Sequence, residues 1–162
     1  MQSAKYYWGL LRLSLGFIML WAFVDKLFGL GFATTHDKAW LAGNSPTFSF
    51  LKFGTKGPFA IWFQMIAGSP IVDWLFMMGL MLIGLALLFG IGVRLAGYGG
   101  ALMMLLMYLA SATPPLNNPL IDEHIIYAII FLAFTAVDPG LTFGFGRCWS
   151  EIPMVKKFPI LK

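Results

Sequence analysis

Four long apolar stretches constrain this 162-residue chain more than any other feature of its sequence. They cover about residues 6–30, 71–91, 95–112 and 119–138. The hydrocarbon core of a bilayer is about 30 Å thick and a helix rises about 1.5 Å per residue, so each stretch can span it. Backbone groups in lipid need internal hydrogen-bond partners, so these stretches predict α-helices. A membrane β-barrel would need alternating segments of about ten residues, which the sequence lacks.

The composition agrees with lipid as the solvent of this chain. Hydrophobic residues make up 59% of the sequence and charged residues only 11%, against about a quarter charged in ordinary soluble domains. This balance argues against a soluble enzyme and against a nucleic-acid-binding protein. A single cysteine, Cys148, excludes an internal disulfide. We therefore expect an all-α integral membrane four-helix bundle that forms one domain over residues 1–162.

Two cap-plus-proline pairs and one long loop organise the chain between these stretches. Ser69-Pro70 and Asn118-Pro119 each place a good N-cap residue before proline, which is typical of a helix start. The outer loop from about residue 31 to 69 is long for a small bundle, and such loops are usually functional or structured. Its apolar residues at helical spacing predict a short interfacial helix: Phe59, Trp62, Phe63 and Ile66. Glycines within the spans predict close helix approach: Gly79, Gly84, Gly90, Gly97 and Gly100.

The distribution of basic residues predicts how the spans are oriented. With four spans, both termini and the turn at Arg94 lie on one face of the membrane. That face carries seven basic residues, whereas the other carries four: Lys26, Lys38, Lys52 and Lys56. The positive-inside rule then places both termini in the cytoplasm.

Two cations within the first span are the first candidates for a functional role, because charge inside a membrane is costly. Arg12 and Lys26 are fourteen residues apart, close to four helical turns, so they lie near opposite ends of the span. In the functional interpretation, Lys26, Asp25 and Trp21 line a polar pocket at the outer end. In the alternative, both cations only extend their charged ends to the headgroups.

The densest polar cluster lies at the start of the fourth span, with Asn118, Asp122, Glu123, His124 and Tyr127. Capping accounts for Asn118, and the helix dipole accounts in part for the two acids. His124 is on the same helical stripe as interior-facing positions and could exchange protons near neutral pH. The alternative is a histidine that only forms hydrogen bonds at the interface.

The sequence carries no haem, iron–sulfur, flavin or metal-binding motif. Of the two histidines, His36 falls in a loop, and neither has further ligands at the spacing that a zinc site requires. The turn from Gly90 to Arg94 lacks the lysine–hydroxyl pair of a phosphate-binding loop.

Several segments of the chain, in order, are similar to a known family. They are Arg12–Gly16, Trp21–Leu27, Phe53–Phe59, Val72–Phe76, the turn at Gly90–Arg94, and Asn117–Pro119 with Asp122–Ala128. The chain resembles the DoxX/DoxD family of four-helix membrane proteins. The resemblance implies a multi-pass protein of a prokaryotic plasma membrane. It also implies a role as the membrane subunit of a thiosulfate:quinone oxidoreductase, with quinone as electron acceptor.

This resemblance implies roles for the polar residues at each end of the bundle. Lys26 and His124 are the expected catalytic residues. The residues expected to bind substrate or quinone are Trp21, Asp25, Asn118, Asp122, Glu123 and Tyr127. Arg12 and Arg94 are the expected polar residues of the inner face. The expected partners are the lipid bilayer and a second small membrane subunit or respiratory complex, with a homo-oligomer left open and no nucleic acid. The alternative is a non-catalytic accessory or assembly subunit, and a transporter is disfavoured because the middles of the spans are apolar.

Overall fold

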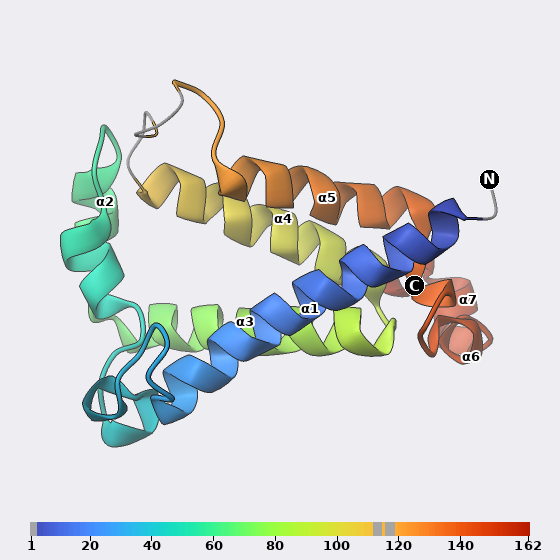
Figure 1. Cartoon of the computed structure of the whole chain (residues 1–162), viewed down its shortest axis with the longest axis horizontal. Coiled ribbons are helices and arrows are strands. Elements are labelled where there is room, and N and C mark those ends of the chain that lie inside the picture. Colours follow the sequence, from blue (N-terminus) through green and yellow to red (C-terminus); the bar gives the residue numbers. More distant parts are fainter. Residues whose placement is uncertain (1–2, 112–114, 116–118) are drawn as a thin grey trace.

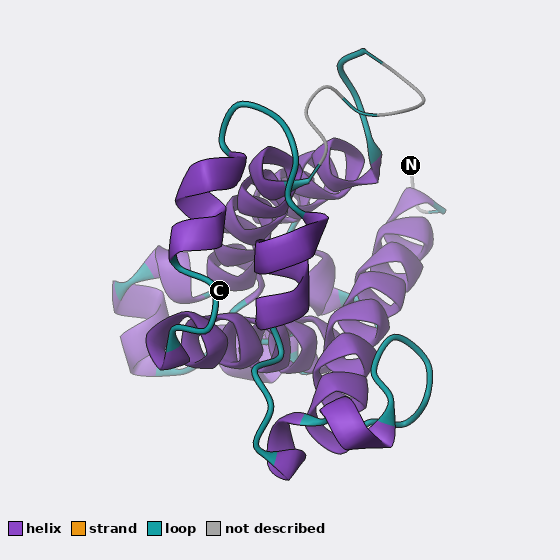
Figure 2. Ribbon diagram, turned by 90° about the vertical axis from the view of Figure 1, so that its left-hand side faces the viewer, coloured by secondary structure: helices purple, strands orange, loops and turns teal. Residues whose placement is uncertain are grey.

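The computed structural model describes residues 3–111, 115 and 119–162, and these residues form helices joined by loops, without a strand (Figures 1 and 2). The α-helices are α1 (Ala4–Phe28), α2 (Ala60–Met65), α3 (Pro70–Phe89), α4 (Val93–Ala110), α5 (Glu123–Val137), α6 (Gly146–Ser150) and α7 (Pro153–Lys157). Shorter 3₁₀ turns lie at His36–Lys38, Trp40–Ala42, Pro139–Leu141 and Pro159–Leu161, and a π-helical turn lies at Phe50–Gly54.

The long helices form two packed pairs. Helix α1 packs across α3, α4 packs along α5, and the turn at Gly90–Gly92 joins the two pairs. Helices α1 and α5 meet near the start of α1, where Trp8 and Phe134 contact edge to face with ring centroids 6.3 Å apart. Both chain termini lie at this end, at the right of Figure 1, and α2 stands crosswise at the opposite end.

Small residues allow the helices of each pair to approach closely. A β-carbon on Gly84 of α3 would lie 2.7 Å from the backbone nitrogen of Leu20, and one on Gly16 of α1 would lie 2.9 Å from Cβ of Leu87. In the second pair, a β-carbon on Gly100 would lie 2.5 Å from the ring of Phe131. The predicted close approach is therefore confirmed at Gly84 and Gly100.

Apolar side chains fill the interior and also cover much of the outside. Buried residues of the core include Leu15, Met19, Met77, Leu80, Leu87, Met104, Phe131 and Phe134. On the outward faces, Leu75 is 70% exposed, and Leu102 and Ile129 are each 59% exposed. Helices α1, α3 and α4 are long and apolar enough to cross a membrane, whereas the apolar α5 has only 15 residues. Together these features suggest a lipid bilayer as the surroundings.

The start of the last long helix differs from the sequence prediction. The cap-plus-proline pair predicted a start at Asn118-Pro119, but α5 begins at Glu123. Its N-cap is Asp122, whose carboxylate accepts hydrogen bonds from the backbone N–H groups of His124 and Ile125. These bonds satisfy free donors of the first turn, which explains why the helix starts there. Asn118 lies outside the described residues. The predicted start at Ser69-Pro70 is confirmed, since Pro70 is the first residue of α3.

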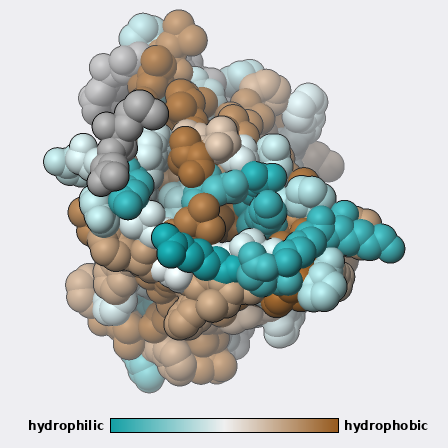
Figure 3. Space-filling model, turned by 90° about the vertical axis from the view of Figure 1, so that its right-hand side faces the viewer, coloured by the Kyte–Doolittle hydropathy of each residue, from teal (hydrophilic) through white to brown (hydrophobic). Residues whose placement is uncertain are grey.

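The end of the molecule with both termini carries most of the basic residues. Lys5 is the second residue of α1 and Arg94 the second residue of α4. Helices α6 and α7 add Arg147, Lys156 and Lys157. Figure 3 shows hydrophilic side chains gathered across this end, with hydrophobic surface beside them. The backbone N–H of Arg94 also donates to the carbonyl of Lys162, which ties the C-terminus to the turn between α3 and α4.

Candidate functional site

An apolar groove of about 1140 Å³ runs along the helices α3 and α4. Its walls come from both helices, from the π-helical turn at Phe50–Gly54 and α2 at one end, and from Trp149 of α6 at the other. It therefore extends over nearly the whole length of the α3–α4 hairpin. Leu75, Leu82 and Leu102 line it and are each more than half exposed, so the groove opens sideways, toward the surface that would face lipid.

One lysine supplies the charge of this groove. Lys26, in the last turn of α1, is half-buried and is the one charged side chain among the described residues that line it. Thr47, from the loop after α1, lies at the same end. The remaining walls are almost entirely aliphatic, aromatic or glycine. The groove thus combines a long apolar trough with one ammonium group, the pattern of a site for an amphiphile.

Two glycines line the groove, Gly79 of α3 and Gly99 of α4. The space beside Gly79 is filled by the side chain of Met103. A β-carbon on Gly99 would meet only Ile83, at 3.8 Å, which is ordinary van der Waals contact. The space beside Gly99 is therefore free, in contrast to the tight contact at Gly100 one residue later.

Asp25 and Trp21 do not line a polar pocket with Lys26 but contact the chain near them. Asp25 is buried, and its carboxylate accepts hydrogen bonds from the backbone N–H groups of Phe32 (3.3 Å) and Ala33 (2.9 Å). It therefore shapes the chain immediately after α1. Trp21 stacks on Phe17 and meets Phe32 edge to face. Of the three residues expected to line the outer pocket, only Lys26 lines the groove.

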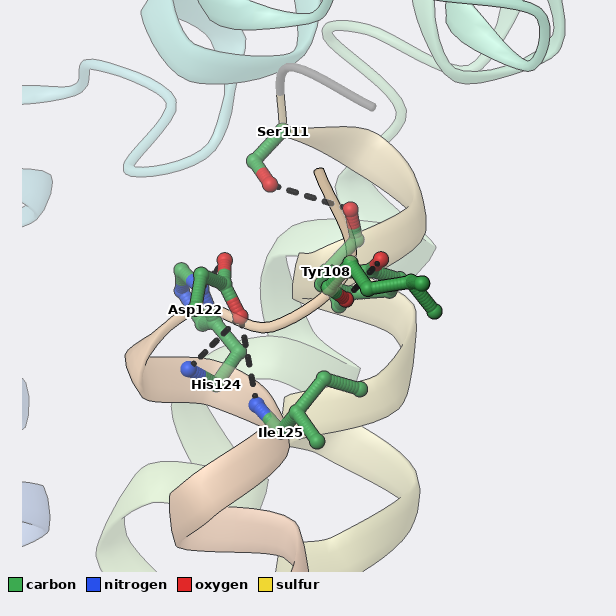
Figure 4. Close-up of polar contacts among 6 residues, drawn as sticks. Tyr108, Ser111, Asp122, His124 and Ile125 are labelled. Atoms are coloured by element: carbon green, nitrogen blue, oxygen red, sulfur yellow. Dashed lines mark hydrogen bonds and ion pairs between the residues drawn. The ribbon is translucent and has the colours of Figure 1, made fainter. Parts of the chain in front are cut away.

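The described polar residues at the start of α5 form a helix cap (Figure 4). The side chain of Asp122 accepts from the backbone of His124 and Ile125, and its second oxygen lies 2.8 Å from Nδ1 of the His124 ring. Tyr108 at the end of α4 donates its hydroxyl to the carbonyl of Leu120 at 2.7 Å, which holds the approach to α5 against α4.

Opposing effects set the ionisation of Asp122. Partial burial disfavours its charged form, but the hydrogen bonds from the His124 ring and the Ile125 N–H, with the attraction of His124, favour it. The net result is that the pKa of Asp122 lies below its ordinary value. The carboxylate is therefore ready to hold the imidazole through a charge-assisted hydrogen bond.

The two residues expected to be catalytic are not brought together. Within the described chain, no hydrogen bond or ion pair joins Lys26 to His124. Figures 1 and 2 both show the end of α1 and the start of α5 at well-separated corners. The two residues lie apart because α1 and α5 converge only at the opposite end, near Trp8 and Phe134. Glu123 is exposed and Tyr127 packs against the core.

Arg12 is fully buried, and its guanidinium binds backbone carbonyls. Nη1 donates to the carbonyls of Leu87 and Leu88 at the end of α3, and Nη2 donates to those of Thr142 and Phe143 at 2.9 Å. Its Nε has no partner among the described residues. Because the free carbonyls at the end of a helix carry partial negative charge, they are natural partners for a cation. Arg12 thus joins three segments that are distant in sequence.

Sequence reasoning missed the groove and the loop residues that close its end. The bond of Thr47 to Asp73, with its hydroxyl 2.5 Å from Oδ1, spans 26 residues and has no local signal. The one available signal was glycine, which can either permit close packing or leave a hollow; the open space lies beside Gly99, which was not among the glycines singled out in the sequence.

Comparisons with protein-family models, with curated proteins and with solved structures found no match to this chain.

Proposed function

We propose that this chain is a DoxX-like integral membrane protein that binds a quinone in the α3–α4 groove, as a subunit of a quinone-linked oxidoreductase. The observation that carries the proposal is the groove itself, about 1140 Å³ of apolar space with a single lysine at one end. Its volume exceeds the usual range of about 300–1,000 Å³ for small-molecule pockets, as suits a ligand with a long tail.

The chemistry of a quinone matches the two parts of this groove. A quinone has a planar ring with two carbonyl acceptors and an isoprenoid tail. The Lys26 ammonium can donate a hydrogen bond to a ring carbonyl and stabilises the negative charge that develops when the ring is reduced. The tail lies along the leucines and phenylalanines of α3 and α4, where burial of each methylene group contributes about 0.8 kcal/mol.

The proposed topology places the groove across the bilayer. In it α1, α3, α4 and the shorter α5 are the four spans, both termini are cytoplasmic and Lys26 lies near the outer headgroups. The gathering of basic residues at the end with the termini supports this orientation. The sideways opening lets a quinone enter directly from the lipid.

The proposed electron donor is thiosulfate or a similar small sulfur compound, which the resemblance of the sequence implies. A second small membrane subunit is the proposed partner in this half of the reaction. Oxidation of two thiosulfates to tetrathionate releases two electrons, and reduction of one quinone to quinol takes up two electrons and two protons.

Quinone binding by the purified chain in lipid nanodiscs tests the proposal directly. We expect saturable binding of a long-chain quinone, and native mass spectrometry should find quinone retained in the purified protein. Lys26→Met keeps the apolar length of the side chain but removes its charge, and should weaken binding about tenfold. Lys52→Met, at an exposed residue outside the groove, is the matched control. Absence of quinone from both measurements would refute the proposal, and quinone binding without thiosulfate-dependent reduction, even with the partner added, would refute only its enzymatic part.

A non-catalytic accessory subunit is the second candidate, favoured by the surface of α2. Ile61, Trp62 and Met65 of this short helix are 66%, 65% and 78% exposed, so it presents an apolar face at one end of the molecule. Co-purification of a stoichiometric membrane partner that is lost in Trp62→Ser, together with absence of bound quinone, would favour this function.

A further inference from the structure

A second, smaller pocket lies outside the groove, where the loop after α1 meets the start of α3. It has a volume of about 290 Å³ and is lined by Trp40, Gly43, Asn44, Ser45, Gly68, Pro70, Asp73 and Trp74. Two features set it apart from an ordinary surface hollow, namely a buried carboxylate and a pair of indole rings.

Asp73 is only 6% exposed, and its carboxylate has no cationic partner among the described residues. Its Oδ1 accepts from the hydroxyl of Ser45 (2.8 Å) and from the backbone and hydroxyl of Thr47 (3.3 and 2.5 Å). Its Oδ2 accepts no hydrogen bond from the described residues, and no described lysine, arginine or histidine lies within 4 Å of it. Asp73 lies in the first turn of α3, where the helix dipole favours negative charge. Because Oδ2 is not among the fully buried unpaired atoms and no described cation pairs with it, it is accessible to a cation that enters the pocket.

The indole rings supply the rest of a cation site. Trp40 and Trp74 meet with ring centroids 4.8 Å apart and planes at 72°, so they form two walls of a corner beside Asp73. The faces of indole rings attract organic cations, and aromatic corners of this kind bind quaternary ammonium groups. A divalent metal ion suits the pocket less well, because Ca²⁺ and Mg²⁺ take six or more oxygen ligands.

We infer that this pocket binds an organic ammonium group, with Asp73 as the counter-charge and Trp40 and Trp74 as the aromatic walls. The small volume limits the bound part to a head of the size of choline or a short alkylamine. The same chemistry is presented by the headgroup of a choline lipid and by a free amine in solution. The inference does not depend on the quinone proposal, because the pocket and the groove share no lining residue.

Titration with choline tests the inference, with 3,3-dimethylbutan-1-ol as the probe of similar shape that lacks the charge. In nanodiscs of phosphatidylglycerol at constant ionic strength, we expect saturable calorimetric binding of choline and at least about tenfold weaker binding of the uncharged alcohol. Asp73→Asn keeps an oxygen to accept from Ser45 and Thr47 but removes the charge, and should weaken choline binding about tenfold or more. Trp74→Leu should also weaken choline binding about tenfold or more. Because Trp74 is 57% exposed, we expect this variant to fold even if Asp73→Asn does not.

Two further comparisons separate the outcomes. Trp62→Leu, at another exposed tryptophan (65%) outside the pocket, should leave choline binding unchanged. If the occupant is a lipid headgroup, nanodiscs of phosphatidylcholine should suppress choline binding, and native mass spectrometry should find phosphatidylcholine retained by the protein. If the occupant is a free amine, choline should bind equally well in nanodiscs of either lipid. Both of these results support an ammonium site. Absence of saturable choline binding in phosphatidylglycerol, or binding that survives both Asp73→Asn and Trp74→Leu, would show that Asp73 only clamps the loop and would overturn the inference.

Discussion

Arg94 and Asp138 form a two-pronged ion pair, with Nε donating to Oδ1 at 2.8 Å and Nη2 donating to Oδ2 at 2.6 Å. The pair connects the start of α4 to the residue that follows α5, so it closes the α4–α5 hairpin at the end with the termini. Asp138 has a φ of 45°, the left-handed conformation that ends α5. Both side chains are partly exposed, at 27% and 31%, so solvent screens the pair.

We expect the Arg94–Asp138 pair to contribute a measurable but modest stabilisation. In a double-mutant cycle of Arg94→Gln and Asp138→Asn, the coupling free energy of unfolding should be about 1 kcal/mol, near the upper end for partly exposed pairs because the geometry is bidentate. Asparagine tolerates the left-handed conformation, so Asp138→Asn tests the charge without breaking the turn. Chemical denaturation in detergent measures this coupling, and a value near zero would show that the pair does not stabilise the fold.

Replacement of Arg12 should destabilise the protein much more strongly. Arg12→Lys retains the charge, but a single ammonium cannot serve the carbonyls of both α3 and the segment at Thr142–Phe143. Buried carbonyls would then lose their partners, at a cost of about 2–4 kcal/mol in the free energy of unfolding. Phe143 adds to this dependence because it is left-handed, with a φ of 56°, and its carbonyl is one of the acceptors.

Arg147→Lys is the matched control for Arg12→Lys. Arg147 is exposed on α6, so the same chemical change there should alter stability by no more than about 0.5 kcal/mol. Equal thermal midpoints for the two variants in detergent would contradict a structural role for Arg12.

The Asp122–His124 pair should make stability depend on pH in the acid range. The pKa of Asp122 in the folded protein lies below its ordinary value, so its contribution is fully present above the unfolded pKa of about 3.9. That contribution is lost as the pH falls from there through the lowered folded value. We therefore expect the thermal midpoint to fall between about pH 5 and pH 2.

Asp122→Asn isolates the charge from the cap. Asparagine caps helices about as well as aspartate, so this variant should fold but should show a smaller loss of stability on acidification. Glu123→Gln, at the exposed neighbouring acid, should retain the acid-dependent loss of the wild type. The pH effect would have another origin if Asp122→Asn and the wild type lost stability in parallel.

Filling the groove at Gly99 should block its occupant without unfolding the protein. A side chain at this position enters open space, since only Ile83 would lie within 4 Å of its β-carbon, and helix propensity improves when glycine is replaced. Quinone affinity should decline in the order Gly99→Ala, Gly99→Leu, Gly99→Phe, with at least about a tenfold loss for the last.

Leu105→Phe adds bulk to the same helix at a partly exposed position that does not line the groove. It should leave quinone affinity unchanged in the same nanodisc assay. If affinity does not depend on the size of residue 99, the quinone binds elsewhere.

The helical class and most helix bounds were predictable because they depend on local patterns. The apolar runs predicted the long helices, and Ser69-Pro70 predicted the first residue of α3. The start of α5 was missed because two capping signals competed, and the carboxylate of Asp122 reaches two N–H groups of the first turn. The short helix in the outer loop was also predicted, although α2 is only six residues long.

The candidate site was less predictable, because helical periodicity says which face a residue is on but not which helix that face meets. Lys26 and His124 were both expected to be catalytic, yet Lys26 lies at a groove beside α3 and α4, whereas the His124 ring is held by Asp122. Asp25 was expected to bind substrate or quinone and Asp73 had no expected role, whereas in the structure each carboxylate accepts hydrogen bonds from backbone or hydroxyl groups of the outer loop.

The sequence by itself determined that this chain forms long apolar helices with their basic residues concentrated at one end, because hydrophobicity, glycine and proline act over a few neighbouring residues. Tertiary structure decided that α1 pairs with α3 and α4 with α5, that Arg12 binds carbonyls from two distant segments, and that a groove opens along α3 and α4. These outcomes depend on contacts between residues as many as 131 positions apart, and such contacts are set by how side chains fill shared space.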